Sequence, residues 1–390
     1  MRRILFVFHV SSVGGGSYCL YNLLKAIDRT VFEPVVLLPG SGSLCDEISK
    51  LDIRIEYMPG MSTYPYSTSL LSYRSVRKLI GLRGSYSDFA GFLEKESPEI
   101  VYFNSLMLFP YLRIAKRAGC KTVLHVREHW VLGKHPVQLA SMRKAVYRHA
   151  DRLVAINRYS ASIFPKMSAA IVYDWIDMDA RKGPSLADIM GPDGDRCKVY
   201  LFLGGTTRIK GALQVIRTFS SSIVGEDRRL LVLGVDPSHR VERKRGLRER
   251  LLYWTGDKAY EAEVIASCRQ DPRVVCAPAI YEIATIMEQA AGYVSFFTIP
   301  HANLALAESV ISQLPAVVAR TDESLEYSEE GRLCLLYGLG DLDEFKSAWL
   351  KLDADPTALE AELASGSERV AARFAPDRNG SVFNQVLKSL

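Results

Sequence analysis

One stretch of the chain, residues 198–219, combines a short apolar strand, a glycine loop and the start of a helix. It reads KVYLFLGGTTRIKGALQVIRTF, and apolar residues recur at helical spacing from Leu213 onward. Glycines let a backbone approach an anion, a helix N-terminus carries positive partial charge, and Arg208 and Lys210 add two cations. The stretch therefore predicts a phosphate-binding turn. It contains no Gly-Lys-Ser/Thr, so it is not a P-loop, and an ordinary turn with solvated cations is the competing interpretation.

The length of the chain, 390 residues, predicts about two domains rather than one core. No run approaches the roughly 20 apolar residues that a membrane span needs. The opening MRRILFVFHV is too short for a span, and no small-residue cleavage site follows it. The seven cysteines are scattered without a C-x-x-C pair, so neither disulfides nor a zinc site are expected. These features favour a cytoplasmic protein.

Charge is unevenly shared along the chain. Residues 1–175 hold 23 basic and 13 acidic residues, whereas the remainder holds 26 basic and 31 acidic ones. A basic N-terminal half predicts an anionic partner such as membrane headgroups, a phosphorylated lipid or nucleic acid; solvated surface charge is the alternative. Residues 64–87 interleave cations with apolar residues, which is typical of a helix lying on an anionic membrane or of a mobile surface helix.

Strand and helix patterns alternate through the N-terminal half, which predicts βαβ units and a parallel sheet. The first strand is expected at residues 4–10, and Gly14, Gly15 and Gly16 follow it. They fall at the carboxyl end of a strand, where parallel sheets bind ligands. The spacing is not G-x-G-x-x-G and no acidic ribose-binding residue follows, so a dinucleotide site is not predicted.

A second group of polar residues follows the strand expected at residues 122–126. His125, Arg127 and Glu128 place titratable groups at the catalytic edge of a parallel sheet. Their combination favours a catalytic role, although a histidine at this place is often structural.

An interdomain linker is expected at residues 176–197, which lack periodicity and are rich in glycine and proline. Its Asp177-Met178-Asp179 matches the short D-x-D metal motif, but we interpret this as chance and expect no metal. The basic run 240–250 resembles a nucleic-acid patch. Acidic residues intervene and no aromatic residues are interleaved with it, so a solvated helix is favoured over nucleic-acid binding.

Glu308 lies within an otherwise apolar helical pattern. A carboxylate among apolar neighbours needs a partner. The hydroxyls of a ribose would serve, and so would an internal salt bridge.

Taken together, these motifs resemble retaining glycosyltransferases of the GT-B fold, family 4. The resemblance covers nearly the whole chain and includes the GGG loop, ADRLVAINRYSASIF, YDWIDMD and GGTTRIKG. Its most specific part is HANLALAESVISQLPAVVARTDESLEY. There Glu308, Leu314-Pro315 and Glu326 fall where family members carry the second glutamate of E-x7-E, a Gly-Leu-Pro and a later Pro-Glu.

The resemblance implies an α/β fold of two Rossmann-like parallel-sheet domains that face each other across a cleft. Residues 1–175 would bind the acceptor, and residues 198–371 would bind the nucleotide-sugar. A C-terminal helix at about 372–390 would pack back on the first domain.

The resemblance also implies the site residues. Lys210, with Arg208, would neutralise the diphosphate leaving group, and Glu308 would accept hydrogen bonds from the ribose. The backbone near Ala277 to Ile280 would hold the base. Candidate catalytic residues are His125, Arg127, Glu128 and Lys210. Candidate donor-binding residues are Gly14, Gly15, Gly16, Gly205, Arg208, Lys210, Ala277, Ile280, His301, Asn303, Leu304 and Glu308.

The implied activity is retaining transfer of a sugar from a UDP- or GDP-sugar, without metal or cofactor. The acceptor would be lipid-linked or a polysaccharide, in the synthesis of exopolysaccharide, capsule or lipopolysaccharide. The protein would be cytoplasmic and peripheral on the inner face of the membrane, with no nucleic-acid partner.

Two departures from the family pattern concern the donor site. Pro300 replaces the first glutamate of E-x7-E, whose role would be unfilled or pass to His301 or Asn303. The family's usual arginine shortly after the strand glycine is missing at Gly205, and Arg208 would substitute from a different position. A nucleotide-sugar-binding protein without transferase activity is therefore the alternative.

Overall fold

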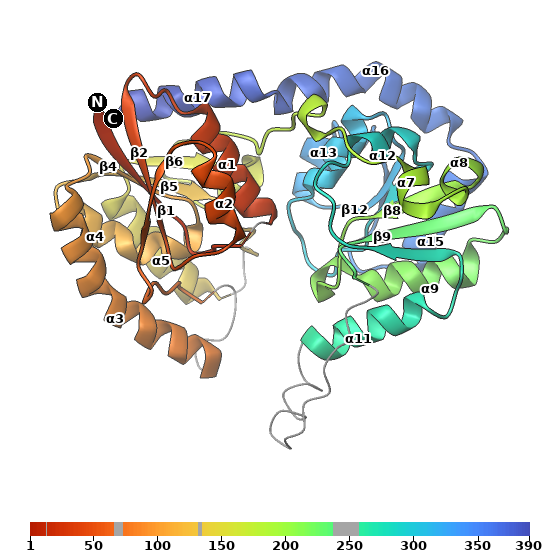
Figure 1. Cartoon of the computed structure of the whole chain (residues 1–390), viewed down its shortest axis with the longest axis horizontal. Coiled ribbons are helices and arrows are strands. Elements are labelled where there is room, and N and C mark those ends of the chain that lie inside the picture. Colours follow the sequence, from red (N-terminus) through yellow and green to blue (C-terminus); the bar gives the residue numbers. More distant parts are fainter. Residues whose placement is uncertain (13, 66–72, 132–134, 237–256) are drawn as a thin grey trace. The chain divides into compact units, whose positions relative to one another are not determined.

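The computed structural model describes residues 1–12, 14–65, 73–131, 135–236 and 257–390 (Figure 1). The chain forms two compact units, Met1–Trp175 with Ala375–Leu390, and Ile176–Phe374. We call them unit 1 and unit 2. The basic run 240–250 and residues 66–72 of the expected surface helix lie outside the described residues. None of the described helices is long and apolar enough to cross a membrane.

Unit 1 is built on a seven-stranded sheet in the order β3-β2-β1-β4-β5-β6-β7, and every strand pair is parallel. The strands are short apolar segments, as expected where helices cover both faces. Their bounds are β1 (Arg2–Val7), β2 (Phe32–Leu38), β3 (Arg54–Tyr57), β4 (Ile100–Phe103), β5 (Lys121–Val126), β6 (Arg152–Ala155) and β7 (Ala169–Ile171).

Helices cover both faces of this sheet. Those of unit 1 are α1 (Gly15–Ala26), α2 (Ser43–Ser49), α3 (Tyr73–Glu96), the 3-10 helix η1 (Leu106–Tyr111), α4 (Leu112–Arg117), α5 (Pro136–His149), α6 (Arg158–Ser162) and α17 (Pro376–Lys388). The helix expected within residues 64–87 is part of α3, which continues to Glu96.

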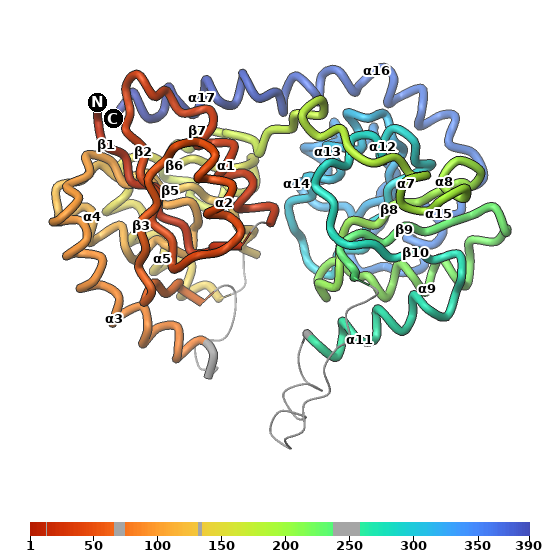
Figure 2. Tube along the Cα trace, in the orientation of Figure 1, coloured from red at the N-terminus to blue at the C-terminus, as the bar shows by residue number. Residues whose placement is uncertain are grey.

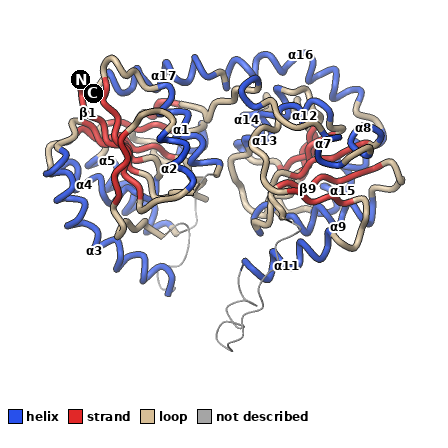
Figure 3. Tube along the Cα trace, viewed as in Figure 1, coloured by secondary structure: helices blue, strands red, loops and turns tan. Residues whose placement is uncertain are grey.

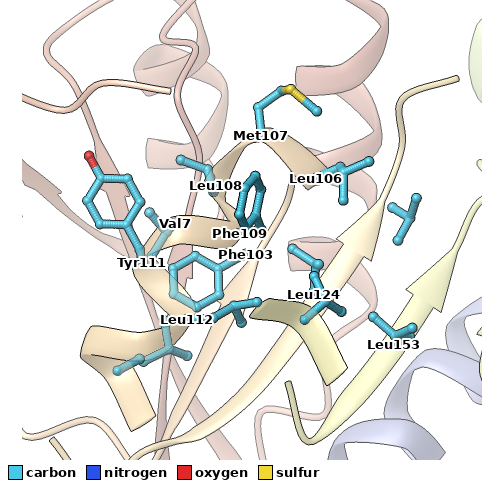
Figure 4. Packing of buried hydrophobic residues seen from close by; sticks show 14 of the residues in the cluster. Val7, Phe103, Leu106, Met107, Leu108, Phe109, Tyr111, Leu112, Leu124 and Leu153 are labelled. Atoms are coloured by element: carbon cyan, nitrogen blue, oxygen red, sulfur yellow. The ribbon is translucent and has the colours of Figure 1, made fainter. Parts of the chain in front are cut away.

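Alternate residues of each strand pack into two separate cores, because successive side chains of a strand point to opposite faces. Leu5 and Val7 of β1 belong to the core beneath α3, η1, α4 and α5, shown in Figure 4. Ile4 and Phe6 belong to the core beneath α1, α2 and α17. The C-terminal helix α17 lies beside α1, where Asn384 donates to the carbonyl oxygen of Ala26 at 2.8 Å (Figure 2).

Unit 2 is built on a six-stranded parallel sheet in the order β10-β9-β8-β11-β12-β13. Figure 3 shows its strands between two layers of helix. The strands are β8 (Lys198–Phe202), β9 (Arg228–Leu233), β10 (Val274–Ala277), β11 (Gly292–Val294), β12 (Ala316–Ala319) and β13 (Leu335–Tyr337).

The helices of unit 2 connect these strands. They are η2 (Asp179–Arg181), α7 (Leu186–Met190), α8 (Asp193–Arg196), η3 (Arg208–Lys210), α9 (Ala212–Ser222), α11 (Asp257–Cys268), α12 (Ala284–Gln289), α13 (Leu304–Ile311), α14 (Asp322–Tyr327), α15 (Leu342–Ala354) and α16 (Thr357–Phe374). The expected fold class, two Rossmann-like parallel-sheet domains, is confirmed.

The segment expected to be a linker, residues 176–197, differs from that expectation. It belongs to unit 2 and contains three short helices, η2, α7 and α8. It is tied to the rest of unit 2, since the Leu186 N–H donates to Gln289 Oε1 at 2.8 Å. Gly183 packs closely against the rest of unit 2, since a Cβ at this position would overlap the backbone of Glu282.

Candidate functional site

The carboxyl ends of β8 and β11 mark the place in unit 2 where the strand order reverses. Open parallel sheets bind their ligands at such a switch point. β8 leads into residues 203–211 and α9, whereas β11 leads into residues 295–303 and α13. The two loops are tied together, because the Thr298 N–H donates to the Ile209 carbonyl oxygen at 2.9 Å.

Glycine is required where these two loops meet. Gly211, immediately before α9, has a φ of 68° in the left-handed region. A Cβ at this position would overlap the carbonyl oxygen of Phe296 in the other loop. Gly205 has a φ of 56°, and its Cβ would lie 3.1 Å from the Gly234 carbonyl oxygen. The glycines of this stretch therefore allow close backbone packing at the switch point.

Two cations lie in the turn between β8 and α9. Lys210 is half-buried, and no described residue forms an ion pair or hydrogen bond with its ammonium group. Burial lowers the pKa of Lys210. Arg208 is exposed, and its guanidinium lies 4.7 Å from the centre of the Tyr260 ring. A half-buried ammonium near a helix N-terminus is suited to an anionic ligand.

Glu308 lies on α13 with 4% of its surface exposed. Its Oε1 forms an ion pair with Nη1 of Arg181, which comes from η2. The Nε of Arg181 also donates to the Tyr281 carbonyl oxygen at 2.8 Å. Of the two partners considered for Glu308, the structure contains the internal salt bridge. The sequence offered no signal for Arg181, because it lies in the segment expected to be a linker.

The neighbouring candidates on the β11 side differ in their surroundings. Asn303 is buried; its Oδ1 accepts from the Tyr293 hydroxyl at 2.9 Å, and its Nδ2 donates to Ser295 Oγ at 3.4 Å. Its side chain is therefore used within the protein. Half-buried Leu304 begins α13, and the half-buried His301 ring packs edge-on against Phe297.

The segment expected to hold the base follows β10. The carbonyl oxygen of Ala277 accepts from the backbone N–H groups of Gly234 and Val235, at 2.9 and 3.0 Å. Ile280 is half-buried in the loop that precedes α12, next to Tyr281, the residue bonded to Arg181. The guanidinium group of Arg181 thus joins the loop between β10 and α12 to α13.

Asp177 and Asp179, the D-x-D pair, are used locally. Asp177 Oδ1 accepts from the Ala180 N–H at 3.0 Å, and Asp179 lies 3.5 Å from the Lys182 ammonium. Within the described ranges, no group of three or more His, Cys, Asp or Glu residues could hold a metal ion.

In unit 1 the strand order reverses between β1 and β4, and α1 begins at this edge of the sheet. Gly14 precedes α1, whereas Gly15 and Gly16 form its first turn rather than a free loop. A Cβ at Gly15 would meet no atom within 4 Å, and at Gly16 it would first meet Phe8 at 3.8 Å. Contacts within the described chain therefore leave room beside this turn.

His125 lies on β5 with 1% of its surface exposed. Its Nδ1 lies 2.9 Å from the Tyr102 hydroxyl oxygen, and its Nε2 has no hydrogen-bond partner among the described residues. Burial, reinforced by the charge of Arg127, places the pKa of His125 well below its usual value. The imidazole is therefore neutral at neutral pH.

Arg127 and Glu128 both have partners within unit 1. Arg127 donates from Nη2 to both carboxylate oxygens of Asp174, at 2.8 and 2.7 Å. Glu128 accepts from the Leu106 N–H at 2.7 Å and from the Ser105 hydroxyl, so it caps the start of η1. Burial raises the pKa of Glu128. Asp174, which orients Arg127, was missed from the sequence because nothing local connects it to β5.

Residues 14–169, most of the N-terminal part of unit 1, match the family model described as the glycosyl transferase 4-like domain. No curated protein matches the sequence.

Solved structures match the chain over its full length. HepE of Anabaena in complex with UDP-glucose is similar with a TM-score of 0.75 at 15% identity, covering 100% of both chains. Sucrose-phosphate synthase of Thermosynechococcus elongatus has a TM-score of 0.73 at 13% identity, covering 100% of this chain and 99% of the other. The lipopolysaccharide outer core galactosyltransferase WaaB has a TM-score of 0.60 at 14% identity, with the same coverage.

The fold of the chain is therefore the GT-B fold of these glycosyltransferase structures. Over residues 14–169, the match to the glycosyl transferase 4-like domain agrees with the resemblance to family 4 that the sequence motifs carry.

Proposed function

We propose that this protein is a retaining glycosyltransferase that uses a nucleotide-sugar donor bound mainly by unit 2. The observation that carries the proposal is Lys210. It is a half-buried ammonium without a partner among the described residues, at the switch point of the sheet. HepE, with the same fold, was crystallised with UDP-glucose, which supports a UDP-sugar as the first donor to test.

The proposed chemistry uses the groups around the switch point. Lys210, Arg208 and the N-terminus of α9 stabilise the negative charge that develops on the departing diphosphate, so no metal is needed. Glu308 accepts hydrogen bonds from the ribose, and the loop around Ile280 holds the base. The acceptor hydroxyl attacks the anomeric carbon on the face from which the diphosphate leaves, so the configuration is retained.

We assign the acceptor to unit 1, beside the Gly14 to Gly16 turn. His125 is the candidate for a direct catalytic role there, because it is neutral and its Nε2 has no partner among the described residues. Arg127 and Glu128 act by positioning, since Asp174 and η1 hold them. A lipid-linked or polysaccharide acceptor in cell-surface glycan synthesis is favoured, as in WaaB, a lipopolysaccharide galactosyltransferase.

A basic surface of unit 1 favours action at the cytoplasmic face of a membrane. Four exposed cations, Arg113, Arg117, Lys144 and Arg148, line a groove of about 860 Å³ between α3, α4 and α5. None of the four forms an ion pair with a described residue. We call these residues the basic face. It is complementary to anionic phospholipid headgroups.

The alternative is a protein that binds a nucleotide-sugar without transferring the sugar. Pro300 favours it, because proline supplies no carboxylate to the donor sugar where the family has its first motif glutamate. Binding with neither transfer nor donor hydrolysis would support this alternative.

The test is a thermal-shift panel with UDP, GDP, ADP, dTDP and CMP, followed by transfer assays with the matching sugar nucleotides. A nucleotide at about 100 times its Kd should add about 2.7 kcal/mol of stability. We expect one nucleotide to stabilise the wild type, and Lys210→Ala to lose that shift and about 10²–10³-fold in kcat. Lys182→Ala, which removes an exposed cation of unit 2, is the control. If Lys210→Ala retains full binding and transfer, the proposal is wrong.

A further inference from the structure

Three segments of unit 2 meet at one side chain, that of Arg181. It comes from η2, its Nε donates to the Tyr281 carbonyl oxygen at 2.8 Å, and its Nη1 pairs with Glu308 Oε1. The side chains of Arg181 and Glu308 are only 12% and 5% exposed. Arg181 therefore joins the loop after β10 to α13.

The ion pair with Arg181 stabilises the charged form of the Glu308 carboxylate. A carboxylate with so little exposure is stable in its charged form only when it is paired and hydrogen-bonded. Arg181 supplies that pairing, with its Nη1 against Oε1 of Glu308. The ion pair fixes the position of the carboxylate, whose oxygens retain lone pairs that can accept hydrogen bonds from a ligand.

We infer that Arg181 is a positioning residue of the nucleotide site, which holds the Glu308 carboxylate in place for the ribose and so makes the site selective for ribonucleotides over 2′-deoxyribonucleotides. The inference rests on the proposed function, in which Glu308 binds the ribose. In this inference Arg181 acts through Glu308 and not through a contact of its own with the nucleotide.

The physical reason is that a charged acceptor held in place strongly favours a ligand with matching hydroxyl donors. A hydrogen bond to a charged group contributes more than a neutral one, and an unmatched buried acceptor costs free energy. A ligand that lacks the 2′-hydroxyl should therefore bind about 10- to 100-fold more weakly. Without Arg181, the carboxylate would take up a proton or turn away, and the preference would disappear.

Arginine is suited to this position because its donors point in fixed directions from one planar group. One nitrogen holds Glu308 while another holds the Tyr281 carbonyl oxygen. A lysine carries the charge but has a single nitrogen, so it would preserve the ion pair and not the second link.

The experiment measures the affinities of UDP and 2′-deoxy-UDP for the full chain by calorimetry, with GDP and 2′-deoxy-GDP as a second pair. We expect the wild type to prefer UDP by about 10- to 100-fold. Arg181→Met should weaken UDP binding until it equals 2′-deoxy-UDP binding, which stays nearly unchanged. Glu308→Gln should have the same effect, and Arg181→Lys should restore most of the preference.

Two further variants test whether a lost preference for UDP reflects a loss of folding. Arg181→Met leaves a buried carboxylate unpaired, whereas the double variant Arg181→Met/Glu308→Gln removes both charges and should regain thermal stability without regaining the preference for UDP. Lys182→Gln, the exposed neighbour, should behave as the wild type.

The outcomes separate this inference from the proposed function. If Arg181→Met weakens both nucleotides equally, Arg181 binds the diphosphate directly and the inference is wrong. The same conclusion follows if the wild type binds UDP and 2′-deoxy-UDP equally well. If no nucleotide binds the wild type, the proposed function fails, and this inference fails with it.

Discussion

At the scale of single residues, the side chains of the candidate site differ in whether the protein itself has satisfied them. Glu308, Asn303, Arg127 and Glu128 all have partners within their own unit. Lys210 has none among the described residues, although burial disfavours its charged form. An unpaired charge is costly unless a ligand compensates it, so Lys210 is the residue whose properties should depend most on the donor.

The pH dependence of nucleotide binding should reveal the loss of charge on Lys210. Burial lowers its pKa, so its charge is lost at a lower pH than that of an ordinary lysine, whose pKa is about 10.4. Because only the ammonium form attracts the diphosphate, nucleotide affinity should fall as pH rises through the lowered pKa. Lys210→Arg keeps its charge over this range and should abolish the fall.

The measurement is nucleotide affinity by calorimetry between pH 7 and 10, with Lys182→Gln as a control. The apo protein should change in the opposite direction, since the unfolded chain holds its proton to higher pH and stability therefore rises across the same window. An affinity for the wild type that stays constant up to pH 10 would contradict a role for the Lys210 charge.

At the scale of elements, the decisive feature is the contact between the loops that follow β8 and β11. Glycine at position 211 permits it, because a Cβ there would overlap the Phe296 carbonyl oxygen. The hydrogen bond from Thr298 to Ile209 depends on the same approach. The local structure around Lys210 thus depends on the neighbouring loop after β11 as well as on its own turn.

Gly211→Ala should therefore destabilise unit 2 and weaken nucleotide binding. The left-handed backbone alone costs about 1–2 kcal/mol for alanine, and the overlap with Phe296 adds to it. Gly84→Ala is the matched control: Gly84 lies in α3, its Cβ would meet nothing within 4 Å, and the change should stabilise by about 0.5–1 kcal/mol.

Urea unfolding of the two variants gives the free energies, and thermal shift with the nucleotide gives the binding. Equal stability of Gly211→Ala and Gly84→Ala would show that the loops are not held together as described.

Much of the element structure could be predicted from the sequence. The alternation of apolar runs with helical spacing predicted the strands and their parallel arrangement, because these patterns act over a few neighbouring residues. The helix at 64–87 was placed too early, since α3 extends to Glu96 and its last turns bury Phe89 and Leu93 in the core of unit 1. Residues 176–197 differ from the expected linker because of a contact that is distant in the sequence: Gly183 packs closely against Glu282.

At the scale of the whole molecule, the surplus of basic residues is concentrated in unit 1. Residues 1–175 carry the basic surplus, and the basic face collects four exposed cations of unit 1 around one groove. His149, in the same groove, shows their combined field: burial lowers its pKa first, and Arg148, Arg113 and Arg117 lower it further.

The basic face should bind anionic membranes. A variant with Arg113, Arg117, Lys144 and Arg148 changed to Gln should lose binding to vesicles containing phosphatidylglycerol by about a hundredfold or more, because each cation contributes about 1 kcal/mol near the surface. The measurement is vesicle co-sedimentation at low and high salt, since this binding should weaken as salt screens it.

The matched control changes four exposed cations of unit 2 to Gln: Arg217, Arg332, Lys346 and Lys351. Equal loss in both variants would mean that net charge, rather than the basic face, governs binding. Strong binding of the wild type to uncharged phosphatidylcholine vesicles would also contradict the prediction.

The sequence by itself determined the two parallel-sheet domains and the glycine turn with its cations. Both follow from local patterns of apolar residues, glycine and charge that need no knowledge of distant contacts. Only the tertiary structure decided which charges are satisfied. It paired Arg181 with Glu308 and Arg127 with Asp174, and it left Lys210 without a partner among the described residues. Burial makes these pairings matter, and burial depends on segments that are distant in the sequence and adjacent only after folding.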